Sequence, residues 1–438
     1  MELDRSTIGM IGVAITLLLI FIRVPIGVAM GLVGLGGIAA IMSWSAAVGI
    51  AKGIPYALIG DWNLSAVPMF LLMGYIASST GLTNGIFQAA RIFVGRVPGA
   101  LASSTVLGSA LFASASGSSV ATAAAFSRIS IPEMMRSKYD PAFASGSVAI
   151  AGTLGSLIPP SVLFIIYGML ADVSISAMFM AGVVPGILSA VMLVAYITIR
   201  AKLNPTIAPP DHTVYSRQEK IETLKDVWPL PVLILGVLGG IFAGIFTATE
   251  AGAIGAALAL ILALARKALT RKTFIKALVD TAEGTAAIFI IVVGAAIFSR
   301  FMSYSNLPGV MSDWLVSFSD NPMILMIAIS GIFLVLGMVL ESISIMLLMV
   351  PLLLPLLNVL DINLIWFGLI MVKLLEIGLC TPPVGMNVYV IKSALGDQIK
   401  LTTIFRGVFG FILVDLLTLG LLLAYPQISL WLPNLMSR

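Results

Sequence analysis

Two proline pairs interrupt apolar segments of this chain, in GTLGSLIPPS at Gly152–Ser161 and in IGLCTPPVGM at Ile377–Met386. Proline has no backbone N–H and its ring collides with the preceding turn, so an α-helix breaks at such a pair. Hydroxyl side chains lie beside the carbonyl groups that each break frees: Thr153, Ser156, Ser161 and Thr381. Uncharged oxygens of this kind suit a hard monovalent cation such as Na⁺, which half-helix C-termini also favour.

The two breaks belong to an internal repeat. At a shift of 223 residues, Gly155 falls on Gly378 and the pair Pro159–Pro160 falls on the pair Pro382–Pro383, without a gap. A kink tolerated by neighbouring helices is the alternative explanation for one such motif. Because the motif occurs twice at repeat-related positions, a functional site is favoured over a kink.

A polar interruption accompanies each break. The apolar segments 98–132 and 322–360 are too long for one membrane span and too short for two, and their centres read SASGSS at Ser114–Ser119 and LESIS at Leu340–Ser344. This pattern is typical of a re-entrant hairpin whose tip lies at membrane depth. The N–H groups and hydroxyls of the first tip suit an anion or a cation, with close packing of small residues as the alternative.

A few ionisable residues lie within apolar segments. Glu341 in the second tip is either a functional carboxylate or a cap for the following half-helix. Lys373 and Glu376, spaced i, i+3, are expected to pair with each other, with a coupling or substrate role as the alternative. Glu250, in the sequence TATE, has the spacing of a capping box. Asp415 should face protein or water, with its partner left open.

The elements that position these residues must be membrane helices. The chain has 438 residues, of which 59% are hydrophobic and 10% charged, with a mean hydropathy of +1.10, so it is a polytopic α-helical protein of the lipid bilayer. One cysteine and one histidine exclude a disulfide framework and a His/Cys metal cluster. The basic residues gather in a few loops, which indicates the positive-inside rule and not a nucleic-acid partner.

Charge in the loops orients the chain. The apolar segments lie at about 8–22, 25–43, 62–80, 98–132, 141–170, 177–199, 229–246, 248–265, 277–300, 322–360, 363–391 and 404–424. Basic residues flank the first hairpin, whose open end should face the cytoplasm, and acidic residues flank the second, whose open end should face outward. Threading the chain through these constraints gives ten crossings and two hairpins, with both termini periplasmic.

The predicted fold class is an all-α polytopic membrane protein with an inverted repeat, two re-entrant hairpins and two proline-broken helices. The first repeat covers residues 1–199, with scaffold helices at about 1–80, the hairpin 98–132 and the broken helix 141–170. A cytoplasmic loop, 200–228, connects it to the second repeat, 229–438, with the hairpin 322–360 and the broken helix 363–391. This arrangement is typical of secondary transporters with a midplane site. Intramembrane proteases are disfavoured because histidine ligands and a second well-placed aspartate are missing.

The chain resembles the large membrane subunit of tripartite ATP-independent periplasmic (TRAP) transporters, of the DctM or SiaM type, over essentially its full length. Three stretches carry the resemblance: KYDPAFASGSVAIAGTLGSLIPPSVLFIIYG, GGIFAGIFTATEAGAIGA and FGLIMVKLLEIGLCTPPVGMNVYVIKS. The resemblance implies an elevator-type transporter of the bacterial inner membrane, driven by Na⁺. It also implies two partners, a small four-helix membrane subunit and a soluble periplasmic substrate-binding protein. The small subunit is expected to be a separate polypeptide.

Carried across motif by motif, the resemblance implies two sodium sites and a substrate site. The first sodium site is expected at Ser116, Gly117, Ser118, Ser119, Gly155, Ile158 and Pro160. The second is expected at Gly337, Glu341, Ser342, Cys380, Thr381 and Pro383. The substrate-binding residues are expected to be Ser118, Ser119, Ser161, Ser344 and Asn387.

The function predicted from these features is Na⁺-coupled import of an organic carboxylate, such as sialic acid or a C4-dicarboxylate, with no organic cofactor and no catalysis. Na⁺ would neutralise the carboxylate, since an uncompensated charge does not cross hydrocarbon readily. The alternative is a stand-alone ion-coupled carboxylate symporter that needs no binding protein.

Overall fold

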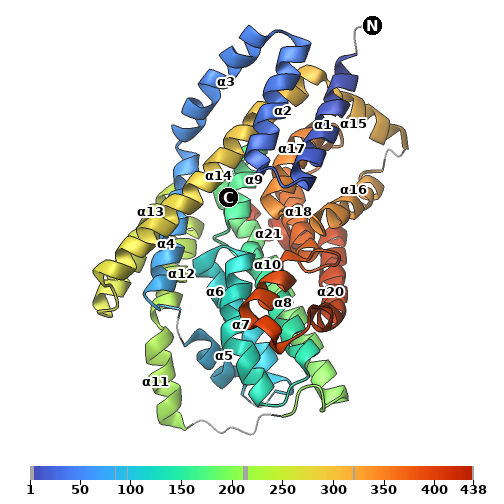
Figure 1. Cartoon of the computed structure of the whole chain (residues 1–438). Helices are drawn as coiled ribbons and strands as arrows, with labels where there is room; N and C mark the ends of the chain where they lie inside the picture. Colours follow the sequence, from blue (N-terminus) through green and yellow to red (C-terminus); the bar gives the residue numbers. More distant parts are fainter. Residues whose placement is uncertain (1–3, 84, 96, 211–215, 319–320, 437–438) are drawn as a thin grey trace.

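The computed structural model describes residues 4–83, 85–95, 97–210, 216–318 and 321–436, and within these ranges the regular structure is entirely helical (Figure 1). The N-terminal part of the chain is a series of helices. Its elements are α1 (Arg5–Phe21), α2 (Ile26–Ile41), α3 (Trp44–Ile59), the short η1 (Asn63–Ser65), α4 (Ala66–Ser79) and α5 (Ile86–Val94).

The first predicted hairpin and broken helix are both present. Helices α6 (Ala100–Ser116) and α7 (Ser119–Arg136) meet at a two-residue turn, and α8 (Pro141–Leu157) and α9 (Val162–Leu170) meet at the first proline pair with a bend of 44°. The long helix α10 (Ile175–Leu203) follows. A hairpin and a proline-broken helix therefore occur in the predicted order.

The same order recurs in the second half. The connecting elements are α11 (Arg217–Val227), α12 (Pro229–Phe242), α13 (Ala248–Ala265), α14 (Arg271–Ser305) and α15 (Leu307–Phe318). The second hairpin and broken helix follow, with the C-terminal helices behind them: α16 (Pro322–Gly337), α17 (Ser342–Val359), α18 (Leu364–Gly378), α19 (Met386–Leu395), the short η2 (Gly396–Gln398), α20 (Leu401–Ala424) and α21 (Gln427–Met436). The predicted fold class is confirmed.

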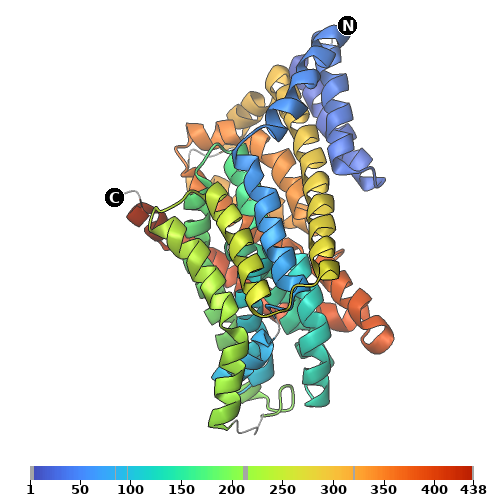
Figure 2. The same cartoon turned by 90° about the vertical axis from the view of Figure 1, so that its left-hand side faces the viewer.

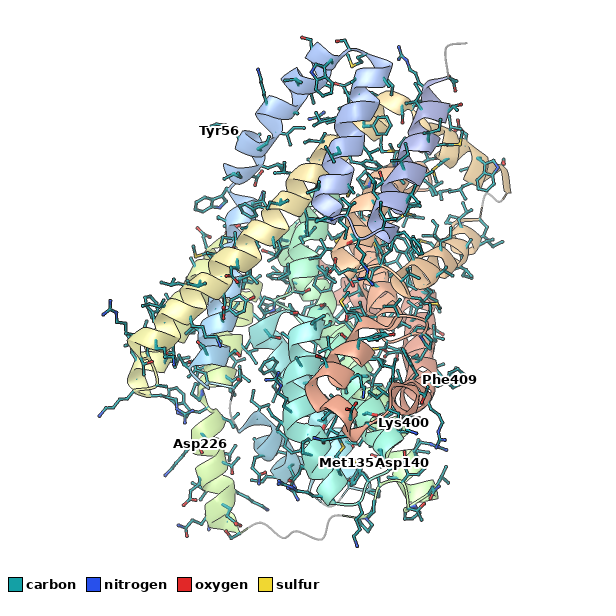
Figure 3. The ribbon with its side chains drawn as sticks, in the orientation of Figure 1. Tyr56, Met135, Asp140, Asp226, Lys400 and Phe409 are labelled. Carbon is teal, nitrogen blue, oxygen red and sulfur yellow. The ribbon has the colours of Figure 1, made fainter. Side chains whose placement is uncertain are left out.

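The two hairpins enter the molecule from opposite ends. Figure 1 shows α6 and α7 in the lower half, with α8 beside them, and α16 and α17 in the upper half, with α18 below α17. Met135, Asp140 and Lys400 lie near one another at the lower end in Figure 3, so the open end of the first hairpin and the start of α20 share that end. The N-terminus lies at the upper end (Figure 1).

Helices α4, α12, α13 and α14 form one face of the molecule, side by side in Figure 2. Close helix crossings depend on glycine: a Cβ placed on Gly294 of α14 would lie 2.0 Å from the carbonyl oxygen of Gly27 in α2. In lipid, small residues at such crossings let two backbones approach each other. Helices α4 and α14 of this face also contact α6 of the first hairpin and α17 of the second, respectively.

Helix lengths agree with a multi-pass membrane protein. Among the described residues, five helices are long and apolar enough to span a bilayer: α10, α13, α14, α17 and α20. Three bent helix pairs raise the number to eight if each pair is one span. The scheme of ten crossings with both termini periplasmic stays a prediction.

The structure also contains helices that the apolar pattern does not predict. Helix α3 lies between the predicted segments 25–43 and 62–80, and its Tyr56 is 87% exposed and points outward (Figure 3). Helices α5, α15 and α21 are likewise absent from the predicted segments; at 9, 12 and 10 residues they are too short to span a bilayer.

The predicted capping box at the start of α13 is confirmed. The Thr247 hydroxyl accepts the backbone N–H of Glu250, and the Glu250 carboxylate accepts the backbone N–H of Thr247.

Candidate functional site

The first hairpin tip is a tight turn between two helices. Gly117 ends α6 with φ +60°, a conformation that costs glycine nothing. Ser118 begins α7 as its N-cap, and its hydroxyl accepts the backbone N–H of Ala121 at 3.4 Å. The hydroxyl groups of Ser116 and Thr122 lie 3.1 Å apart across the turn. The tip therefore presents hydroxyl groups and backbone atoms in place of apolar side chains.

The first tip lies directly against the first proline break. A Cβ placed on Gly155 would lie 2.5 Å from the Ser118 carbonyl oxygen, and one placed on Gly117 would lie 2.9 Å from the Pro160 carbonyl oxygen. The structure therefore brings together the tip and break residues of the first predicted sodium site. The Ile158 side chain faces the other way, against Gly186 of α10.

The second tip meets the second break in the same manner. A Cβ placed on Gly378 would lie 2.6 Å from the Cα of Gly337, and the Val384 N–H donates to the Met338 carbonyl oxygen at 3.2 Å. Pro383 lies in the exposed turn beyond this contact. Gly155 and Gly378, which are related by the repeat, thus have equivalent roles as the points where each hairpin tip touches a broken helix.

Glu341 caps the second half-helix. Its carboxylate accepts the backbone N–H of Ser344 at 3.3 Å and the Ser344 hydroxyl at 3.1 Å. The capping alternative is confirmed. Glu341 also lines the central cavity described below, together with Ser342, whose buried hydroxyl has no partner among the described residues.

Replacing Glu341 with alanine is expected to lower the free energy of unfolding by about 1 kcal/mol, because an N-cap acceptor is lost. Serine at this position should retain most of the stability, since serine is itself a good N-cap. The thermal midpoint of the purified protein in detergent measures both variants. Equal midpoints for the alanine and wild-type proteins would contradict the capping role.

The carboxylate of Glu376 joins the two halves. Its Oε2 accepts a hydrogen bond from the hydroxyl of Ser119 in the first tip, and the Ser119 and Ser156 hydroxyl oxygens lie 2.9 Å apart. Because the single Ser119 proton goes to Glu376, the Ser156 hydroxyl must be the donor to Ser119. Glu376 is 1% exposed, and its Oε1 has no partner among the described residues.

The predicted pairing of Lys373 with Glu376 is wrong. Lys373 Nζ lies 2.7 Å from Asp415 Oδ1 of α20 and 3.3 Å from the Ser189 hydroxyl of α10. The i, i+3 spacing permits contact on one helix, but the packing of α18 against α10 and α20 brings Ser189 and Asp415 to the ammonium group instead. This pairing also answers the question of the Asp415 partner.

A cavity of about 450 Å³ lies where the two tips meet the first break and helices α4 and α14. Hydroxyl groups line it at Tyr75, Ser78, Ser116, Ser118, Ser119, Ser156 and Ser342. Its charged lining residues, within the described part of the chain, are the carboxylates Glu341 and Glu376, with no lysine or arginine. The cavity thus offers hydroxyl groups and two carboxyl groups.

The remaining predicted site residues lie outside this cavity. Cys380 donates its thiol to the Ala149 carbonyl oxygen at 3.3 Å, and the Asn387 amide points to the same oxygen at 3.5 Å. The Thr381 hydroxyl, in the turn after α18, donates to the Ile377 carbonyl oxygen at 2.7 Å. Ser344 contacts Glu341. Ser161 is buried with no hydroxyl partner among the described residues. Roles for these residues in sodium or substrate binding stay predictions.

The site residues that the sequence left without a role are Glu376 and Tyr75. Glu376 carried a signal, because an ionisable residue at membrane depth is a functional candidate by default. Because Lys373 lies three residues earlier on the same helix, the sequence favours an ion pair over a functional role for Glu376. Tyr75 of α4 carried none, since a tyrosine in an apolar segment does not stand out until the fold places it on the cavity wall.

The sequence matches a known family over most of its length. The family described as "Tripartite ATP-independent periplasmic transporter, DctM component" matches residues 13–428. The sialic acid TRAP transporter large permease protein SiaM of Vibrio cholerae is 34% identical over 420 residues, which cover 95% of this chain and 96% of that protein. The C4-dicarboxylate TRAP transporter large permease protein DctM of Pseudomonas aeruginosa is 34% identical over 374 residues, or 85% and 86%.

A solved structure shares the fold. The YdaH transporter of Alcanivorax borkumensis superposes with a TM-score of 0.60 over 84% of this chain and 86% of that one, at 16% identity. At that identity the likeness shows the fold alone.

A third relative has a different named substrate. The 2,3-diketo-L-gulonate TRAP transporter large permease protein YiaN of Escherichia coli is 33% identical over 366 residues, covering 81% of this chain and 82% of that protein.

Proposed function

This chain belongs to the DctM family of large TRAP transporter permeases, and from that premise we propose that it imports an organic carboxylate, driven by a Na⁺ gradient and dependent on a periplasmic binding protein. Its relatives are transport subunits, so the chain is a multi-pass inner-membrane permease and not an enzyme. The relatives are named for sialic acid and C4-dicarboxylates, which supports a small organic acid as the substrate.

The cavity carries this proposal. It lies between the hairpin tips and breaks on one side and helices α4 and α14 on the other, where a moving block would meet a fixed scaffold. In an elevator mechanism the hairpins and broken helices would move together, with the cavity contents, along that face. The substrate would enter while the cavity is open to the periplasm.

The charge of the cavity supports cation coupling. An anionic substrate finds hydroxyl donors there, but the described lining includes two carboxylates and no lysine or arginine. Positive charge must therefore arrive with the substrate, and Na⁺ bound at the two breaks would supply it. Each net positive charge that moves inward gains about 2.3 kcal/mol per 100 mV of membrane potential.

The proposed assembly has three parts. A small four-helix membrane subunit would support the scaffold face, and a soluble binding protein would deliver substrate at the periplasmic side. Both termini of this chain would lie in the periplasm, since the first hairpin opens toward the predicted cytoplasmic end.

Uptake into proteoliposomes tests the proposal. This chain and its small partner are reconstituted, and a candidate binding protein loaded with radiolabelled carboxylate is added under an inward gradient of Na⁺, H⁺ or K⁺. We expect uptake only with Na⁺ and only with the binding protein. Uptake without the binding protein would instead indicate a stand-alone carboxylate symporter, and uptake driven by H⁺ alone would overturn sodium coupling.

A further inference from the structure

Glu376 is a buried carboxylate whose charge has no cationic partner in the described structure. Its Oε2 accepts a hydrogen bond from the Ser119 hydroxyl, but its buried Oε1 has no partner among the described residues. The nearest lysine along its own helix, Lys373, is held by Asp415 at 2.7 Å. A buried carboxylate of this kind is normally paired or bound to a metal ion, because an isolated charge in a low-dielectric interior is very costly.

The surroundings of Glu376 favour a cation. Glu376 lies in the last turn of α18, and Ser156 lies in the last turn of α8. Both ends carry the negative pole of a helix dipole, which attracts positive charge. Ser119 adds a third oxygen at the start of α7, and the three side chains are linked by hydrogen bonds. Three oxygen ligands from three helices, one of them a carboxylate, match the preference of hard cations.

We propose that the Glu376 carboxylate and the hydroxyl oxygens of Ser119 and Ser156 form a sodium-binding site that joins the first hairpin tip to the second broken helix. This inference rests on the proposed sodium coupling and deepens it. Ser119 also belongs to the first predicted sodium site, and Ser156 lies beside the first break. What this site adds is the carboxylate of Glu376, which comes from the second repeat and is in neither predicted sodium site.

The site has a consequence for coupling. Ser119 belongs to the first hairpin and Glu376 to the second repeat, so an ion bound between them holds the two repeats together on one side of the cavity. Without the ion, an ionised Glu376 would repel an anionic substrate in the cavity that it lines. Sodium bound at Glu376 therefore removes this repulsion before the anionic substrate binds.

Equilibrium binding of radioactive sodium tests the site. The full-length chain is purified with its small membrane subunit in lipid nanodiscs, with choline replacing sodium to keep ionic strength constant and with no substrate present. Glu376→Gln keeps the shape and the contact with Ser119 but removes the charge. We expect it to bind one fewer Na⁺ per chain, or to bind it about tenfold more weakly, which corresponds to about 1.4 kcal/mol.

Further variants keep the test decisive. Glu222→Gln makes the same chemical change on the exposed face of α11 and should bind sodium as the wild type does. If Glu376→Gln does not fold, Ser156→Ala tests the site in its place. It removes a single oxygen and should weaken sodium binding several-fold. A sodium-induced infrared difference spectrum of the wild-type protein should show shifted ionised-carboxylate bands that are absent from Glu376→Gln.

The outcomes separate two failures. Wild-type protein that binds no sodium would overturn the sodium coupling proposed above, and this site with it. Wild-type protein that binds sodium while Glu376→Gln and Ser156→Ala bind it equally well would overturn this site alone, as would an infrared spectrum in which only protonated carboxyl groups respond.

Discussion

Lys373→Met is expected to destabilise the protein by about 3–5 kcal/mol, because the change leaves Asp415 charged and unpaired in the interior. The Lys373 side chain is 1% exposed and the Asp415 side chain 0% exposed. The second carboxylate oxygen of Asp415 already lacks a partner among the described residues, so Lys373 is the main source of compensation. Little folded protein should be recovered after extraction in detergent.

The double variant Lys373→Met with Asp415→Leu isolates the cause. Replacing both charges with apolar side chains of similar volume removes the desolvation cost together with the attraction, and such replacements are often neutral or stabilising by about 1–4 kcal/mol. The thermal midpoints of the wild type, the single variant and the double variant measure this. A double variant as unstable as Lys373→Met alone would show that the pair stabilises the helices by more than mutual neutralisation.

This ion pair shows what sequence reasoning reaches and what it does not. On one helix, Lys373 and Glu376 are neighbours, so the sequence favours their pairing. The real partner, Asp415, is 42 residues away on α20, and only the packing of α18 against α20 brings it close. Long-range partners of buried charges are set by tertiary structure, which local spacing does not encode.

The hairpins and breaks were predictable because their causes are local. Two adjacent prolines end a helix wherever they occur, and a polar break in an apolar segment marks a tip. Helix α3 was missed for a related reason. Its apolar residues are interrupted by Lys52 and Pro55. Its position against α2 and α14, which the structure shows, depends on contacts that the sequence does not reveal.

The role of the glycines needed both sequence and structure. The repeat identifies Gly155 and Gly378 as equivalent, but it does not say what they touch. In the structure each lies against the backbone of a hairpin tip, where a Cβ would come within 2.5 Å of the Ser118 oxygen and within 2.6 Å of Gly337. Backbone cannot rotate away as a side chain can, so both positions require glycine.

Gly155→Ala and Gly378→Ala are each expected to reduce Na⁺-driven uptake about 5- to 150-fold. Forcing a methyl group into a packed contact typically costs about 1–3 kcal/mol, and here the cost opposes the seating of a tip on its break. Uptake per folded transporter, with protein amount measured by size-exclusion fluorescence, gives the comparison. Because the tips are equivalent under the repeat, the two variants should have effects of similar size.

Gly331→Ala is the matched control, because it lies in α16, the same helix as Gly337, and a methyl group added there would have nothing within 4 Å. Alanine has the higher helix propensity, so this variant should be as stable as the wild type or slightly more so. If Gly331→Ala impairs uptake as much as Gly378→Ala does, the loss reflects stiffening of the hairpin and not contact at its tip. If Gly155→Ala and Gly378→Ala transport normally, the tips do not need to seat on the breaks, and the block that we propose to move must close by other contacts.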